Sequence, residues 1–140
     1  MRFFTPSIFS LLFIASGSLS AAPVVLHNIQ GYGFDDKGNI DGVRMSPQVE
    51  PLPLQEALEI VLDLQNQWRK SGWLLTDPEE PAYENTSEWI ARIEECRSNA
   101  TFWHVPDKYQ IAVGIACYKD QRYPNEKRFM INFSMGKPWY

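Results

Sequence analysis

The chain has 140 residues, of which 44% are hydrophobic, 14% aromatic and 21% charged, and its formal net charge at pH 7 is -4. This length fits one domain, and the composition is too hydrophobic for a disordered chain and too acidic for a general nucleic-acid binder. The composition indicates a globular protein but names no activity.

The first 21 residues have the layout of a secretory signal peptide. Arg2 gives a positive start, residues 8–15 form a short apolar core, and small residues follow at 16–22. The apolar run is too short to span a membrane. We therefore expect cleavage near residue 21 and a single periplasmic or secreted domain, residues 22–140, with no stable membrane insertion. An uncleaved N-terminal anchor is the alternative.

Charge is unevenly distributed along the expected mature chain. Residues 22–95 contain five basic and 14 acidic residues, whereas residues 96–140 contain seven basic and three acidic residues. Either the two parts attract each other in the folded protein, or the first part forms an acidic surface for a basic partner.

Two strands joined by a tight turn are predicted at the start of the mature domain. Residues 24–34 and 40–45 flank a polar turn in which Gly38 and Asn39 tolerate the positive φ that a hairpin requires. The oxygen-bearing residues of this turn lack the spacing of a twelve-residue calcium loop, so we attribute their presence to turn formation and not to calcium binding.

An amphipathic helix of about 18 residues is predicted after Pro51 and Pro53. Arg69 and Lys70 suit the negative end of the helix dipole, and Gly72 stops the helix. A short extended piece follows at 73–75. The apolar residues that recur at helical spacing are Leu54, Ala57, Leu58, Val61, Leu64 and Trp68.

Residues 76–84 are predicted to form an acidic loop, because Pro78 and Pro81 prevent a helix or a central strand. A second helix is predicted to begin near Asn85, which together with Glu88 has the spacing of a capping box. Its apolar face carries Trp89, Ile93 and Cys96.

The final third of the chain alternates with period two, which predicts strands at 101–105, 109–119 and 129–135. One side of the 109–119 strand is apolar. The other side is thin, with Ala112, Gly114 and Ala116 at its centre, and could face a ligand, a second layer or solvent. The predicted fold class is α+β, with an antiparallel sheet of four to five strands and two helices packed on one face.

The two cysteines of the expected mature domain, Cys96 and Cys117, are predicted to form a disulfide, because an oxidising compartment favours their pairing. This bond would attach the second helix to the buried side of the sheet. A metal pair is the alternative, but zinc requires four ligands and the two cysteines lack the C-x-x-C spacing.

Little in the sequence indicates catalysis. His27 and His104 form no metal-binding pair, no serine lies in a G-x-S-x-G elbow, and no glycine-rich phosphate loop occurs. We expect no catalytic residue, no metal and no cofactor. Basic and aromatic residues gather at 122–140, here called the basic corner, a combination that can bind nucleic acid. Because the whole chain is acidic, we expect no nucleic-acid binding.

Recognition of a basic partner protein is therefore the preferred hypothesis. Large amphipathic aromatics and carboxylates on loops are typical anchors of protein interfaces. In size, export, acidity and a single disulfide the chain is similar to immunity proteins of exported toxins and to inhibitors of wall-degrading enzymes, although no diagnostic motif matches. The residues expected to bind the partner are Asp77, Glu79, Glu80, Tyr83, Glu84, Trp103 and His104.

The alternative hypothesis is a small hydrolase or ligand-binding protein with its site near His104 and the thin side of the 109–119 strand. It predicts a concave pocket lined by Ala112, Gly114 and Ala116, with a histidine or a carboxylate beside it.

Overall fold

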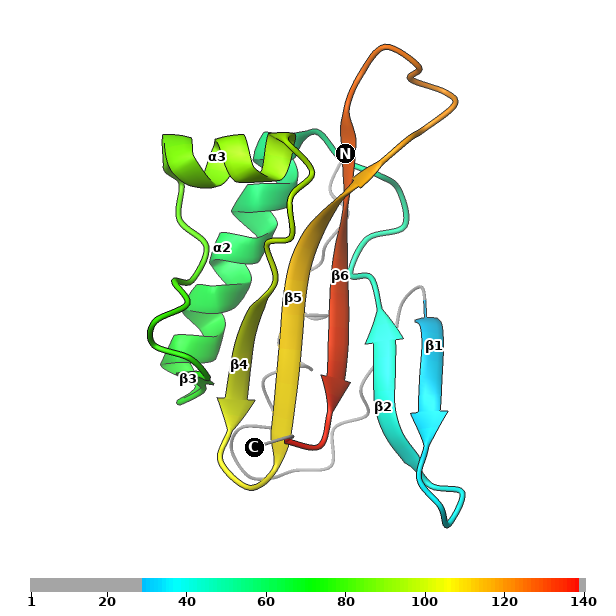
Figure 1. Cartoon of the computed structure of the whole chain (residues 1–140), viewed down its shortest axis with the longest axis vertical. Helices are drawn as coiled ribbons and strands as arrows, with labels where there is room; N and C mark the ends of the chain where they lie inside the picture. The colour runs from blue at the N-terminus through cyan, green and yellow to red at the C-terminus, as the bar shows by residue number, and fades with distance from the viewer. Residues whose placement is uncertain (1–28, 139–140) are drawn as a thin grey trace.

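The structure, a computed structural model, describes residues 29–138 and forms an antiparallel sheet with two helices (Figure 1). The sheet has six strands in the order β1-β2-β6-β5-β4-β3. The elements in chain order are β1 (Ile29–Phe34), β2 (Ile40–Met45), α2 (Leu54–Lys70), β3 (Leu74–Leu75), α3 (Ser87–Glu94), β4 (Thr101–Val105), β5 (Tyr109–Tyr118) and β6 (Arg128–Gly136).

The predicted α+β class is confirmed, and the sheet is larger than the expected four to five strands. The additional strand is β3, which pairs with β4 through Leu74 opposite His104 and Leu75 opposite Trp103. A strand of two residues is too short to show alternation, so only its pairing with β4 identifies it.

The hairpin of β1 and β2 is held by Asp35 in its turn. One carboxylate oxygen of Asp35 accepts hydrogen bonds from the backbone amides of Lys37 and Asn39, at 2.9 and 2.8 Å. Gly38 takes a φ of 81°, the left-handed conformation expected for this turn. Residues 24–28, the first part of the predicted strand, lie outside the described residues.

Helix α2 matches its prediction closely and supplies much of the core. Its apolar stripe, which ends with Trp68, is buried against the sheet, and the Trp68 ring lies 6.2 Å from that of Phe133 on β6. The chain leaves the helix at Gly72, where φ is 83°. No helix between residues 29 and 138 is long and apolar enough to span a membrane.

Helix α3 begins two residues later than predicted, and its N-cap is Thr86 rather than Asn85. The Thr86 hydroxyl accepts a hydrogen bond from the backbone amide of Trp89 at 3.3 Å, and Thr86 has the extended backbone that an N-cap requires. Asn85 and Thr86 both have side chains that can cap a helix, so the sequence pattern did not distinguish them.

The core lies between the helices and one face of β5 and β6. Ile111, Val113 and Ile115 of β5 and Ile131 and Phe133 of β6 are buried, at most 2% exposed. The apolar side of β5 expected from its period-two pattern is therefore the side that packs against the helices. The opposite side is called the open face of the sheet below.

The expected disulfide between Cys96 and Cys117 is present, with a Cα–Cα distance of 5.6 Å. Cys96 lies just beyond the C-terminal end of α3, and Cys117 lies near the end of β5. The bond therefore attaches the end of α3 to the sheet, as expected.

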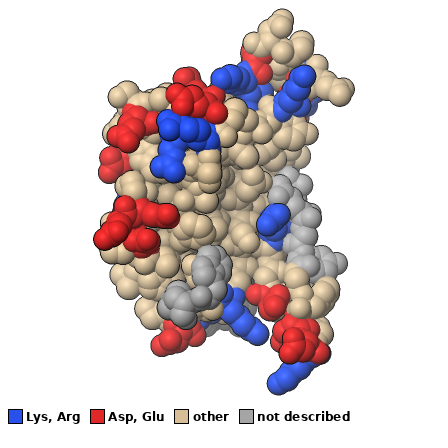
Figure 2. Space-filling model, viewed as in Figure 1, with Lys and Arg blue, Asp and Glu red and all other residues tan. Residues whose placement is uncertain are grey.

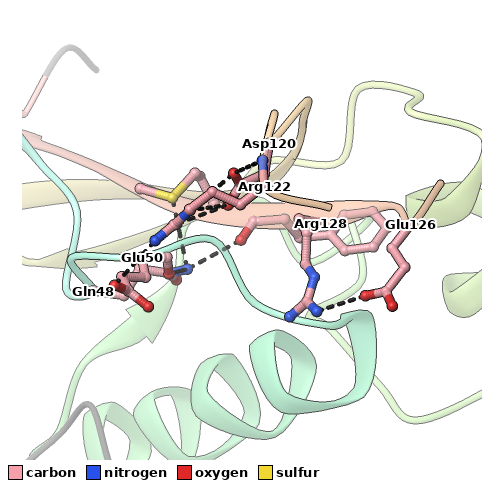
Figure 3. Close-up of polar contacts among 8 residues, drawn as sticks. Gln48, Glu50, Asp120, Arg122, Glu126 and Arg128 are labelled. Carbon is pink, nitrogen blue, oxygen red and sulfur yellow. Dashed lines mark hydrogen bonds and ion pairs between the residues drawn. The ribbon is translucent and has the colours of Figure 1, made fainter. Parts of the chain in front are cut away.

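Ion pairs and stacked side chains hold the β5–β6 connection, which projects beyond the sheet in Figure 1. The Asp120 side chain is only 6% exposed, and the Arg122 guanidinium binds it at 2.8 Å and Glu50 at 3.3 Å (Figure 3). The Arg128 guanidinium lies 4.0 Å from the centre of the Tyr123 ring. Two arginines of the predicted basic corner are thus engaged with carboxylates, because Arg128 also binds Glu126.

The acidic partner of the Asp120–Arg122 pair stays ionised at lower pH than usual. The Arg122 side chain and its backbone amide donate hydrogen bonds to the Asp120 carboxylate, and these bonds lower the pKa of Asp120 below its ordinary value. The pair therefore connects the base of the loop to residue Glu50, which precedes α2.

Candidate functional site

The acidic loop expected at 76–84 is present, and its first part is an exposed turn. The Asp77 side chain accepts a hydrogen bond from the backbone amide of Glu79 at 2.8 Å, and the Glu80 amide donates to the Asp77 carbonyl at 3.1 Å. Asp77, Glu79 and Glu80 are exposed. Local hydrogen bonds thus define the backbone of the turn and leave its carboxylates accessible to solvent.

The end of the loop is anchored in the core by Tyr83. The Gln65 side chain of α2 accepts from the Tyr83 amide at 2.8 Å and donates to the Tyr83 carbonyl at 2.9 Å. The Tyr83 hydroxyl donates to Asn99 and accepts from the Ile115 amide. Burial raises the pKa of Tyr83 above its ordinary value.

Tyr83 therefore offers no surface to a partner in this conformation, contrary to its expected role as an exposed anchor. It is 1% exposed, and its ring lies 4.4 Å from that of Trp89. The proline-rich sequence places Tyr83 in a loop, but the long-range hydrogen bonds turn its side chain inward.

Trp103 lies in the core, whereas His104 contacts the first residue of the acidic loop from strand β4. Trp103 is 2% exposed and packs in the core, with its ring 5.7 Å from that of Trp68. His104 is the next residue of β4 and so belongs to the open face, where its Nδ1 lies 3.0 Å from the Thr76 hydroxyl. The structure therefore keeps Asp77, Glu79, Glu80 and Glu84 as the exposed members of the expected site.

A hollow of about 290 Å³ lies between the acidic loop and α3. Glu84 and Glu88 bring two carboxylates to it, and the Arg92 guanidinium lies 5.3 Å from the centre of the Trp89 ring on the same lining. The described residues that line it are Pro81, Glu84, Thr86, Ser87, Glu88, Trp89 and Arg92.

The residues of α3 in this hollow were missed as site residues from the sequence. Glu88 and Arg92 are four residues apart and so share one helix face, a spacing that was available as a signal. The spacing does not show that the acidic loop places Pro81 and Glu84 beside this face of α3. We define the acidic surface as Asp77, Glu79, Glu80, Glu84 and Glu88 together with the hollow.

Figure 2 shows carboxylates gathered on the helix side of the molecule, at the level of α3 and below it. The five carboxylates of the acidic surface are all exposed, and no lysine or arginine occurs between residues 71 and 91. This surface can attract cations and accept hydrogen bonds from them. Between residues 29 and 138, no group of three histidine, cysteine, aspartate or glutamate residues is placed to hold a metal ion.

The thin side of β5 also carries hollows, as the alternative hypothesis expects. Gly114 lies in both of two adjoining hollows, of about 390 and 280 Å³, the first reaching Ala116 and the second Ala112. Among the described residues that line them there is no histidine and no carboxylate, so His104 is not part of this lining. The described lining of these hollows thus offers binding space without a histidine or a carboxylate.

No family model matches the chain, and comparison with curated proteins and with solved structures finds no similar protein.

Proposed function

We propose that the protein is a small exported binding protein that neutralises a partner protein with a basic surface. The observation that carries the proposal is the exposure of five carboxylates within residues 77–88, a stretch without any lysine or arginine. A concentrated negative field speeds association with a basic partner and selects against acidic ones.

The acidic surface is held in place by contacts with the rest of the protein. Gln65 holds the end of the loop through the Tyr83 backbone, and the disulfide holds the end of α3. A surface that is ordered before binding loses less conformational entropy when the partner arrives. The arrangement therefore favours occlusion of a partner by a preformed surface.

We expect the hollow of the acidic surface to receive a side chain of the partner at the centre of the interface. A lysine or arginine side chain from the partner would lie between Glu84 and Glu88, because these two carboxylates outnumber Arg92, the one cation of the described lining. Charged pairs that lose solvent at the centre of an interface contribute more than exposed pairs at its rim. Asp77, Glu79 and Glu80 would form the rim.

A small hydrolase acting near His104 is the weaker candidate, because the hollows beside β5 lack acid and base groups among their described lining. Ligand binding on that face has better support, because the two hollows adjoin each other there.

Capture of the partner from an envelope or culture-medium extract of the source cells tests the proposal. The purified protein is compared with Glu79→Gln/Glu80→Gln and Glu84→Gln/Glu88→Gln. The control is Glu56→Gln/Glu59→Gln, which removes the same charge from exposed positions on α2.

We expect the wild type and the α2 control to recover one protein in a stoichiometric amount. Both acidic-surface variants should recover at least about tenfold less, as expected when charge-assisted contacts are lost. Added salt should weaken wild-type capture. Recovery of no stoichiometric protein, or equal recovery by all four proteins, contradicts the proposal.

A further inference from the structure

The two hollows beside β5 adjoin each other on the open face of the sheet, and together they are called the trough. They share Ala100, Gly114 and Asn132 as lining residues, so the two hollows lie side by side. Cross-strand pairing places Arg44, Ser134 and Ala112 in one row, and Asn132 opposite Gly114 in the next. Directly opposed residues face the same side of a sheet, so all of these lie on the open face.

An arginine lies at each end of the trough. Arg97 lines the larger hollow and Arg44 lines the smaller one. Both are exposed, and the pair that Arg97 makes with Glu95 is itself exposed on both sides, at 60% and 58%. Such a surface pair is weak and can exchange its carboxylate for that of a ligand.

The part of the trough between the two arginines is lined by short, uncharged side chains. Its centre consists of Ala100, Ala112, Gly114 and Ala116, with the Asn132 and Ser134 side chains also on the lining. On the face seen in Figure 2, the middle of the sheet is almost free of charge, with basic surface on either side of it. The main chain of a ligand could therefore approach the sheet closely between the two arginines.

One wall of the trough is held in place by two independent links. The Asn99 amide donates to the carbonyls of Arg97 and Ile115, at 3.0 and 2.8 Å, and its oxygen accepts from the Ile115 amide at 2.9 Å. The Cys96–Cys117 disulfide ties the same segment to β5. The trough is thus formed before any ligand binds, which reduces the entropic cost of binding.

We propose that this trough binds an extended peptide segment of a partner protein that carries two carboxylates, one for Arg44 and one for Arg97. Guanidinium groups suit carboxylates because they donate paired hydrogen bonds. A sugar fits less well, because the one aromatic residue of the described lining, Phe133, is 1% exposed and belongs to the core face. This site is separate from the acidic surface and has the opposite charge preference.

Gly114 lines both hollows of the trough, so a side chain added at this position tests the proposal. A Cβ added at this position would lie 3.8 Å from Ala100 and from the Asn99 side-chain oxygen, which is ordinary van der Waals contact. Gly114→Ala should therefore fold normally, and Gly114→Val should fill the trough while keeping a residue suited to a strand. Gly42→Ala serves as a control, because a Cβ there comes no closer than 3.5 Å to its neighbours and Gly42 does not line the trough.

The probes are fluorescent nonapeptides of serine and alanine with two glutamates separated by two to six residues, and the same peptides with glutamines. A nonapeptide spans up to about 30 Å when extended, so the series covers a range of distances between the two arginines. Binding is measured by fluorescence anisotropy, and the fold of each variant is checked by circular dichroism and thermal unfolding.

We expect at least one glutamate peptide to bind and its glutamine counterpart to bind at least about tenfold more weakly. Arg44→Gln and Arg97→Gln should each weaken binding about tenfold. Gly114→Val should abolish binding, whereas Gly42→Ala and Glu79→Gln/Glu80→Gln should leave it unchanged. The last variant distinguishes this site from the acidic surface.

The proposal is overturned if no glutamate peptide binds more tightly than about 1 mM. It is also overturned if a folded Gly114→Val variant binds the peptide as the wild type does. Either outcome leaves the acidic surface and its basic partner unaffected.

Discussion

Gln65 and Tyr83 form a reciprocal pair in which one buried side-chain amide binds both backbone polar groups of the other residue. Gln65 is 0% exposed in the middle of α2, and Tyr83 ends the acidic loop. The Gln65 side chain thus binds the Tyr83 backbone through two hydrogen bonds, as a neighbouring strand would, and links helix α2 to the loop. The position of the acidic loop thus depends on a glutamine 18 residues earlier in the chain.

Gln65→Ala should destabilise the protein and loosen the acidic loop. The substitution leaves the buried amide and carbonyl of Tyr83 without these partners, which we expect to lower the free energy of unfolding by about 3 kcal/mol. Urea denaturation measures this change, and limited proteolysis should cut residues 77–84 faster. Gln55→Ala, at an exposed position of the same helix, should change stability by less than about 0.5 kcal/mol. Similar effects of the two substitutions would contradict the anchoring role.

Tyr83→Phe should alter the response to alkaline pH as well as stability. The folded state keeps Tyr83 neutral because burial raises its pKa, so its stabilising effect is complete below the ordinary pKa of about 10. Above that pH the unfolded chain releases the proton first, which favours unfolding. The phenylalanine variant cannot ionise there.

We expect Tyr83→Phe to cost about 1 kcal/mol at neutral pH and the difference from wild type to shrink as pH rises above about 10. Denaturation curves between pH 7 and about pH 11 measure this trend. A difference that stays constant over that range would show that Tyr83 does not titrate as argued.

Asp120→Asn should weaken the attachment of the β5–β6 loop at neutral pH. Because Arg122 lowers the pKa of Asp120, this carboxylate contributes stability above the ordinary pKa of an aspartate, near 4, and loses it as pH falls through the lower folded value. The melting temperatures of the wild type and the variant should therefore converge in acid.

Asp36→Asn, at an exposed position in the β1–β2 turn, is the control for this change. It should melt close to the wild type at neutral pH. A melting temperature of Asp120→Asn equal to that of wild type at pH 7 would contradict the loop attachment.

Replacement of both disulfide cysteines, Cys96→Ser/Cys117→Ser, should lower the free energy of unfolding by about 3 kcal/mol, because the open chain regains the entropy of a loop of about 22 residues. Dithiothreitol should bring the wild type to the stability of this variant and leave the variant unchanged. If dithiothreitol lowers the stability of both proteins equally, the effect does not arise from this bond.

Local patterns in the sequence predicted most of the fold. The helical spacing of α2 and the period-two alternation of β5 and β6 require only near neighbours, and these elements lie where predicted. The disulfide followed from the number of cysteines and the expected compartment. The acidic loop at 76–84 followed from its prolines.

The sequence by itself therefore determined the periodic elements, the turns and the loop that carries the carboxylates. Only the tertiary structure decided that Tyr83 and Trp103 are buried, that Glu84 meets α3 around a hollow, and that Arg44 and Arg97 lie at opposite ends of one trough. The physical reason is range: backbone conformation follows from adjacent residues, whereas burial and the assembly of a site depend on contacts between segments far apart in the chain.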